Sequence, residues 1–278
     1  SLTNSSSGVS NYLWNFGDAS TSTSISPSKT YNNAGTYDIK LTVTSANGCT
    51  HSLTKPVNVF AIPTPYFSAN DVCIGTQTDF TNQSVMPSGG GDYIWRFGDG
   101  KTSTVANPSY KYASAGAYDV RLVAISIAGC KDSAIIGLSV FDKPSPSFTV
   151  ADVCDGKAVQ FINTSSGTVS QTWNFGDGSN GTAFSPSRTY TSPGTYKVIL
   201  TSTNSNNCSN VFEGNVTVKA NPELVFSANN HCLGSEETFN NFSSGAASFT
   251  WKFGDGDSSK STQANHTYVN SGTYSIKL

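Results

Sequence analysis

The feature that most constrains this chain of 278 residues is a short pattern, Trp-x-Phe-Gly-Asp, that occurs four times. The four copies begin at Trp14, Trp95, Trp173 and Trp251. A period of about 80 residues is too long for a solenoid repeat and matches the size of a small autonomous domain. We therefore predict four consecutive domains, covering residues 1–60, 61–142, 143–220 and 221–278.

The second domain shows the strand pattern best. Tyr93, Trp95 and Phe97 alternate with other residues in the period of two that is typical of a half-buried strand. Residues 98–100, Gly-Asp-Gly, then break this strand as a turn, and the last strand of the repeat is expected at 135–141. Short strands separated by frequent turn signals predict an all-β protein made of immunoglobulin-like sandwiches.

These residues resemble the polycystic-kidney-disease (PKD) domain, over the whole chain. The motif is Trp-x-Phe-Gly-Asp-Gly, followed by Pro-x-x-x-Tyr and by Gly-x-Tyr-x-Val/Ile-x-Leu. The first copy departs from it at Ala19, where the others have Gly, and we expect a negative φ there. With its added cysteines, the chain looks like the PKD arrays of very large Bacteroidota surface proteins. That resemblance implies type IX secretion, an extracellular location at the cell surface, and a role in gliding, adhesion or filament formation.

The linkers and the two ends suggest how the domains continue. The linkers at 61–65, 143–146 and 220–222 are short and contain Pro, so we expect the domains to form an extended rod. Ser1 and Leu278 fall inside expected strands. We therefore expect two whole repeats between two partial ones, the first truncated N-terminally and the last C-terminally.

The recurring aspartates and tryptophans have a structural and a functional interpretation. The aspartates are Asp18, Asp99, Asp177 and Asp255. Calcium takes six to eight oxygens, whereas each turn offers one carboxylate, to which only Asp257 adds another, so we favour structural turn residues over a calcium site. The repeated tryptophans share a strand face with other apolar residues, which favours a core role over a sugar-binding platform.

Histidine offers little for catalysis or for a metal site. His266 stands where the other copies have Lys29, Tyr110 and Arg188. We expect His266, His51 and His231 to lie on the surface. No Ser/His/Asp or Cys/His arrangement can be assembled, so we expect no catalytic or cofactor-binding residue, no metal site and no enzyme.

The cysteines are disulfide candidates, because small exported domains commonly carry disulfides. They are Cys49, Cys73, Cys130, Cys154, Cys208 and Cys232. Pairing within a repeat gives Cys73–Cys130 and Cys154–Cys208. Pairing of nearest neighbours gives Cys49–Cys73, Cys130–Cys154 and Cys208–Cys232, which the intervening strands disfavour. A third scheme, Cys73–Cys208, would join adjacent domains, and the same cysteines could instead bond a neighbouring chain.

Charge and hydropathy exclude some classes of function. The 16 Lys and Arg residues are spread thinly and the net charge is −2, which argues against a nucleic-acid partner. The apolar runs are too short for membrane insertion. We expect a structural segment of a secreted bacterial stalk or filament for adhesion, whose partners are neighbouring PKD repeats. Any surface glycan or cell-surface target would bind a region outside the segment. The alternatives are a homo-oligomeric fibre of identical chains and a carbohydrate-binding accessory module of a secreted hydrolase.

Overall fold

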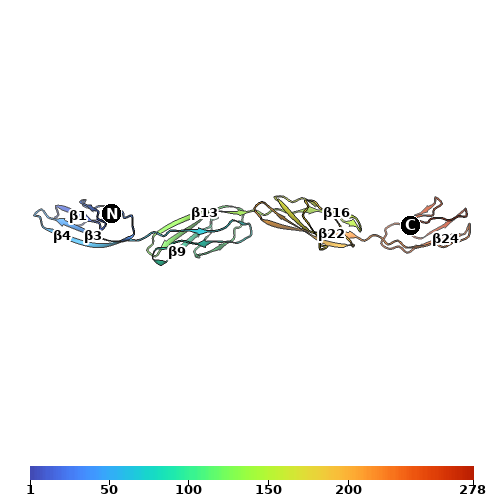
Figure 1. Cartoon of the computed structure of the whole chain (residues 1–278), viewed down its shortest axis with the longest axis horizontal. Coiled ribbons are helices and arrows are strands. Elements are labelled where there is room, and N and C mark those ends of the chain that lie inside the picture. The colour runs from blue at the N-terminus through green and yellow to red at the C-terminus, as the bar shows by residue number, and fades with distance from the viewer. The chain divides into compact units, whose positions relative to one another are not determined.

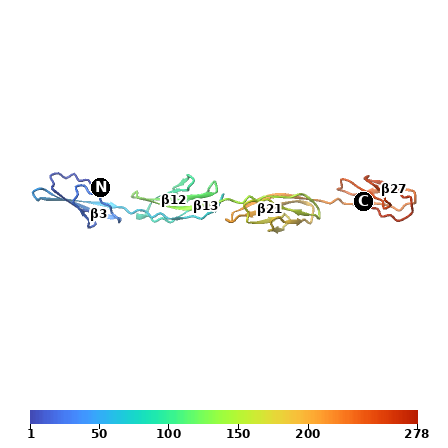
Figure 2. The same ribbon diagram turned by 90° about the horizontal axis from the view of Figure 1, so that it is seen from above.

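The computed structural model describes residues 1–278, except for the side chain of Ser88. Its contacts divide the chain into two compact units, Ser1–Asp142 and Lys143–Leu278. Strands and loops make up both units (Figures 1 and 2). Among the described residues, no helix has the length and apolar character needed to cross a membrane. We number the repeats 1 to 4 by the predicted ranges given above.

Repeat 2 shows the complete architecture. Its strands are β5 (Phe67–Ser68), β6 (Val72–Cys73), β7 (Thr78–Asp79), β8 (Thr81–Asn82), β9 (Gly91–Arg96), β10 (Thr102–Ser103), β11 (Ser109–Tyr110), β12 (Gly116–Ser126) and β13 (Lys131–Phe141), with a 3-10 turn, η1, at Pro87–Gly89. The large sheet has the order β10-β9-β12-β13-β6, in which only the β13–β6 pair is parallel. The pairs β11–β7 and β5–β8 form the second layer.

Repeat 3 has the same arrangement. Its strands are β14 (Phe148–Thr149), β15 (Val153–Cys154), β16 (Ala158–Gln160), β17 (Ile162–Asn163), β18 (Ser170–Asn174), β19 (Asn180–Gly181), β20 (Ser187–Thr189), β21 (Gly194–Thr203) and β22 (Ser209–Lys219). The large sheet has the order β15-β22-β21-β18-β19, and the pairs β14–β17 and β16–β20 lie opposite it. The topology of repeat 2 is thus repeated strand for strand.

Repeats 1 and 4 contain parts of this plan. Repeat 1 has one sheet, β2-β1-β3-β4, made of β1 (Asn11–Asn15), β2 (Thr21–Ser22), β3 (Gly35–Thr44) and β4 (Thr50–Val59). Repeat 4 has the sheets β23-β24-β27 and β25-β26, made of β23 (Phe226–Ser227), β24 (Glu236–Asn241), β25 (Trp251–Lys252), β26 (Ser258–Ser259) and β27 (Ala264–Thr267).

Each repeat has its own hydrophobic core, built from alternating residues. In repeat 2, Trp95 of β9 lies opposite Leu122 of β12 in the register of the large sheet. Both are fully buried, and Phe67 and Phe80 of the second layer pack on the Trp95 ring. Phe80 lies between β7 and β8, and its side chain is in the core. The predicted fold of tandem, all-β, immunoglobulin-like sandwiches is confirmed.

Candidate functional site

The residues that recur in every repeat meet at the Gly-Asp turn, which follows the strand carrying the recurring Trp. In repeat 1, Asp18 Oδ1 accepts a hydrogen bond of 3.1 Å from the Ser20 backbone N–H, which closes the turn between β1 and β2. The other aspartates make the same bond, from Lys101 to Asp99 (3.0 Å), from Ser179 to Asp177 (2.9 Å) and from Asp257 to Asp255 (3.0 Å). Each recurring aspartate therefore uses one oxygen to hold its own turn.

The glycine before this aspartate is required by space as well as by conformation. Gly17 has a φ of 78°, and a Cβ there would lie 2.9 Å from the Asp38 backbone nitrogen. One position later, the expectation of a negative φ at Ala19 is wrong, because its φ is 67°. Hydrogen bonding of Asp18 to Ser20 holds the turn in the shape that Gly100 and Gly178 adopt in other repeats. Ala19 is thus an alanine in a left-handed conformation that suits glycine.

The second oxygen of each turn aspartate faces a side chain eleven residues further on. The four contacts are Lys29 Nζ with Asp18 (2.5 Å), Tyr110 Oη with Asp99 (2.6 Å), Arg188 Nη2 with Asp177 (2.6 Å) and His266 Nε2 with Asp255 (2.6 Å). These four side chains differ in charge and shape, yet all of them can donate a hydrogen bond to a carboxylate. The position is therefore a donor position, a property that sequence reasoning missed because the residue types have little else in common.

In repeats 1, 2 and 4 this donor also lies over the aromatic ring that precedes the turn. Tyr110 stacks on Phe97 at 4.1 Å with an angle of 4° between the rings, and His266 stacks on Phe253 at 4.2 Å with the same angle. In repeat 1, Lys29 Nζ lies 5.5 Å from the centre of the Phe16 ring. Tyr110 is therefore held in place by the ring below it and by Asp99 beside it.

The contacts shift the pKa values of the groups involved. Hydrogen bonds from Lys29 and Ser20 lower the pKa of Asp18 to about 2. Burial by itself would raise the pKa of Asp177, but hydrogen bonds from Ser179 and Arg188 outweigh it and leave that pKa lowered. The hydrogen bond to Asp99 raises the pKa of Tyr110 to about 12. The carboxylate is therefore the stable form where Lys29 or Arg188 faces it.

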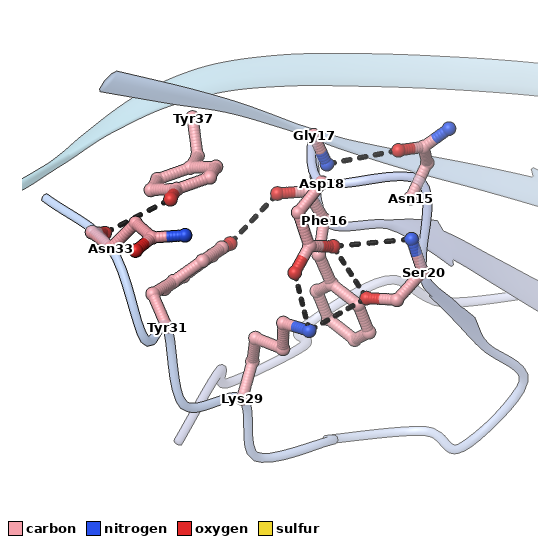
Figure 3. A network of polar contacts seen from close by, with 9 residues as sticks. All are labelled: Asn15, Phe16, Gly17, Asp18, Ser20, Lys29, Tyr31, Asn33 and Tyr37. Carbon is pink, nitrogen blue, oxygen red and sulfur yellow. Dashed lines mark hydrogen bonds and ion pairs between the residues drawn. The ribbon is translucent and has the colours of Figure 1, made fainter. Parts of the chain in front are cut away.

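Two tyrosines in each repeat fix the next loop: the first bonds the strand end that precedes this turn, and the second bonds a loop carbonyl four residues before itself. Figure 3 shows them in repeat 1, where Tyr31 donates to the Phe16 carbonyl (2.8 Å) and Tyr37 donates to the Asn33 carbonyl (2.9 Å). The Tyr31 and Tyr37 rings stack at 4.0 Å. The equivalent bonds join Tyr112 to Phe97, Tyr190 to Phe175 and Tyr268 to Phe253, and Tyr118 to Ser114, Tyr196 to Ser192 and Tyr274 to Asn270.

The recurring tryptophans are enclosed by their own repeats. All four are buried, and the indole N–H of each donates to a backbone carbonyl ten residues further on: Trp14 to Ser24, Trp95 to Val105, Trp173 to Ala183 and Trp251 to Ser261. An indole that is buried and already hydrogen-bonded offers no free ring face for a sugar. Large exposed aromatics such as Phe184 and Tyr66 are single residues of different repeats.

The histidines differ from the expectation that all three are surface residues. His51 is exposed, but the side chains of His231 and His266 are only 19% and 10% exposed. Each of these two lies beside a carboxylate, His231 near Glu237 at 3.9 Å and His266 near Asp255 at 2.6 Å. The turn of repeat 4 also brings Asp257 to His266, so that one imidazole and two carboxylates gather in one place.

The cysteines divide into two groups. Cys73 and Cys208 are disulfide-bonded, whereas the thiols of Cys49, Cys130, Cys154 and Cys232 are free. The pairs Cys73–Cys130 and Cys154–Cys208 within a repeat, and all three nearest-neighbour pairs, are therefore not formed. In repeat 2, the backbone of Cys73 in β6 lies beside that of Phe141, at the end of β13. Cys130 precedes the start of β13. Eleven residues of strand separate the two by about 33 Å, far beyond the reach of a disulfide.

Comparison with protein families finds one domain type along the whole chain. A family model described as the PKD domain matches four times, over residues 1–61, 60–140, 142–220 and 219–278. The predicted boundaries, 60/61, 142/143 and 220/221, stay predictions.

Among curated proteins, the pre-pro-metalloprotease PrtV of Vibrio cholerae is 32% identical over 123 residues, which cover 41% of this chain and 13% of that protein. The collagenase ColA of Bacillus cereus is 50% identical over 40 residues, which cover 14% of this chain and 4% of that protein. The chain thus spans a small part of the curated relatives it matches.

Among solved structures, the PKD1 domain of the Vibrio cholerae metalloprotease PrtV is 32% identical, with a TM-score of 0.26. The match covers 29% of this chain and 98% of that domain. The PKD1 domain of Vibrio anguillarum Epp is 31% identical, with a TM-score of 0.26, and the match covers 28% of this chain and 96% of that domain.

Proposed function

Because the chain belongs to the PKD domain family along its whole length, we propose that it is a structural, non-catalytic segment of a secreted or cell-surface protein. In this proposal the repeats act as a stalk that carries an adhesive region of the same protein away from the cell. The residues that bind a surface glycan or another target would belong to that other region. Export by the type IX system and assembly into a filament are parts of the same proposal.

One observation carries this proposal. The recurring polar groups form their hydrogen bonds within their own repeat, with backbone carbonyls and turn N–H groups. A recurring ligand site would instead keep such groups directed at an accessible cavity. The recurring residues therefore stabilise each repeat, which suits a protein that acts as a load-bearing stalk.

The linkers and the disulfide state support a stalk. Each of the linkers 61–65, 143–146 and 220–222 contains Pro, which stiffens a short connection more than Gly and Ser do. We keep the scheme in which Cys73 bonds Cys208 as part of the proposal, since both are oxidised cysteines. A covalent link of this kind would resist separation of the two repeats under tension.

Force spectroscopy on the full chain tests the proposal. Each repeat of roughly 80 residues releases about 280 Å of extended chain when it unfolds. A Cys73–Cys208 bond would keep residues 74–207 out of the force path, so we expect repeats 2 and 3 to release their length, at high force, only after a reductant has cleaved that bond. Unfolding at low force, together with flexible tethering of the repeats, would rule out a load-bearing role.

A second candidate is an accessory module of a secreted hydrolase. It is favoured by the similarity to parts of the metalloprotease PrtV and the collagenase ColA. Sedimentation of the chain with insoluble collagen and with insoluble polysaccharides separates the candidates. A stalk stays in the supernatant with both materials, whereas an accessory module sediments with one of them.

The third candidate, a fibre of several identical chains, concerns assembly. Mass per unit length of the native thread distinguishes it from a single-chain stalk. One chain of 29.3 kDa in four repeats of about 33 Å gives on the order of 0.2 kDa per Å. A multiple of that value would favour the fibre.

A further inference from the structure

The turn of repeat 4 differs in charge from the three turns that share its geometry. In repeats 1 and 3 the turn aspartate faces Lys29 or Arg188, and in repeat 2 Lys101 lies within the turn itself. Each of these turns therefore contains one carboxylate and one permanent cation. Repeat 4 has Asp257 at the position of Lys101 and His266 at the position of Arg188. Its turn has two carboxylates and no permanent cation among these positions.

The side chains that differ are also the ones that converge. Ligand atoms of Asp255, Asp257 and His266 all lie within 4.8 Å of one another. His266 Nε2 is 2.6 Å from Asp255 Oδ2, while Asp255 Oδ1 accepts the Asp257 N–H at 3.0 Å. The turn thus holds the Asp255 carboxylate with one oxygen and presents the other to the imidazole.

The imidazole is held in one orientation by the core of the repeat. It stacks on Phe253 at 4.2 Å with an angle of 4°, and the Tyr268 ring meets it edge-on at 4.6 Å. Its side chain is 10% exposed. A histidine fixed in this way loses little conformational entropy when Nε2 binds a ligand.

We propose that Asp255, Asp257 and His266 form a site for a divalent transition-metal ion of the zinc class. One imidazole and two carboxylates are a ligand set that suits zinc, with water completing the tetrahedral shell. Calcium and magnesium prefer oxygen ligands alone, so the imidazole disfavours them. Metal binding would replace the direct bond between His266 and Asp255, and the ion would neutralise the second carboxylate. The site goes beyond a stalk role, since it would fasten the turn of one repeat by a metal.

Titration of the full chain with zinc chloride tests the site by calorimetry. The free thiols of Cys49, Cys130, Cys154 and Cys232 are first blocked with iodoacetamide, because thiolates also bind zinc. The matched variant is His266→Arg, which recreates the Arg188–Asp177 pair of repeat 3 and so preserves the turn. Loss of even an outer partner of a metal costs 10- to 100-fold, so loss of this ligand should weaken binding by about tenfold or more. Asp257→Ser should do the same, whereas His231→Gln should have no effect.

The reciprocal variant moves the site to repeat 3. Ser179→Asp with Arg188→His gives that turn the three ligand types of repeat 4, on a backbone that already places Ser179 and Arg188 around Asp177. We expect the number of bound zinc ions per chain to increase by one. Equal zinc binding by the parent chain, His266→Arg and Asp257→Ser would overturn the proposal. Tighter binding of calcium than of zinc at the same residues would overturn it as well.

Discussion

Ala19 has an unfavourable backbone conformation that the glycines at the same position of other repeats adopt without steric cost. It has a φ of 67°, while the glycines at the same position, Gly100 and Gly178, have φ values of 89° and 86°. A Cβ at either glycine would meet no atom within 4 Å, so the cost of a side chain there comes from the backbone conformation alone. The surrounding turn, closed by Asp18, keeps Ala19 in this conformation.

We predict that Ala19→Gly stabilises repeat 1 by about 1 kcal/mol, because glycine adopts a positive φ without the steric cost that an L side chain pays. Hydrogen exchange of the β1 and β3 amides in the full chain measures the gain. Gly178→Ala is the matched control and should destabilise repeat 3 by a similar amount. If Ala19→Gly had no effect while Gly178→Ala was destabilising, the left-handed conformation of Ala19 would be wrong.

Asp18 allows a second prediction at the residue scale. Its pKa is lowered to about 2 from an ordinary value of 3.8, chiefly by the hydrogen bond from Lys29. Between these two pH values the unfolded chain binds a proton that folded repeat 1 does not bind. The stability that the pair contributes is therefore complete above pH 3.8 and is lost as the pH falls towards 2.

NMR titration of the Asp18 carboxyl carbon checks this pKa. In Lys29→Met the midpoint should rise from about 2 towards 3.8, because the main donor is gone. Lys157→Met removes the same charge from another repeat and should leave the midpoint unchanged. A midpoint near 3.8 in the unaltered chain would show that the ion pair does not form in solution.

At the scale of elements, each sandwich depends on a few links between a turn and the loop that precedes the next long strand. Tyr112 precedes β12, and its hydroxyl bonds the Phe97 carbonyl just after β9. This bond is buried, whereas the neighbouring bond from Tyr118 to the Ser114 carbonyl is exposed. Burial raises the pKa of Tyr112, so its hydroxyl remains a donor at any physiological pH.

We predict that Tyr112→Phe destabilises repeat 2 by about 1–3 kcal/mol, because it leaves a buried carbonyl without its donor. Tyr118→Phe should cost less, since water can replace the exposed hydroxyl. Protection of the β9 and β12 amides against hydrogen exchange reports the stability of this repeat within the full chain. Equal costs for the two variants would contradict the role assigned to the buried bond.

At the scale of the whole molecule, the chain repeats one plan with small changes at defined positions. The large sheet has the same strand order in repeats 2 and 3, including the parallel pairs β13–β6 and β22–β15. In each of these pairs, a short strand near the start of the repeat lies beside the end of the last strand of the same repeat. The two cysteine positions of a repeat consequently lie at opposite ends of that strand, which directs disulfides away from pairing within the repeat.

Thiol labelling tests which cysteines are free and which are disulfide-bonded. Iodoacetamide applied to the native chain without reductant should modify Cys49, Cys154 and Cys232 first and Cys130 more slowly, since Cys130 is partly buried. Cys73 and Cys208 should stay unmodified, and peptide mapping should recover them in one linked peptide. A linked peptide with Cys130 or Cys154 would instead favour pairing within a repeat or between chains. The same mapping after reduction, in which all six cysteines are modified, is the control.

The sequence by itself determined the repeats, the strand pattern and the buried aromatic residues of this protein. Alternation over a few residues and turns rich in Gly and Asp are local signals, so they can be read without knowing what lies across the sandwich. The Trp at the centre of each core and the turn after it were predicted in this way, as Trp95 and Asp99 show.

Only the tertiary structure decided which side chains meet. The partner of each turn aspartate is eleven residues away, and in repeats 2 and 4 it is held there by stacking on the Phe ring that precedes the turn. In the sequence, Lys29, Tyr110, Arg188 and His266 look unrelated, whereas in space each donates to an aspartate. The left-handed Ala19 and the gathering of Asp257 and His266 have the same origin. Contacts of this kind depend on how the strands pack, which short-range patterns do not encode.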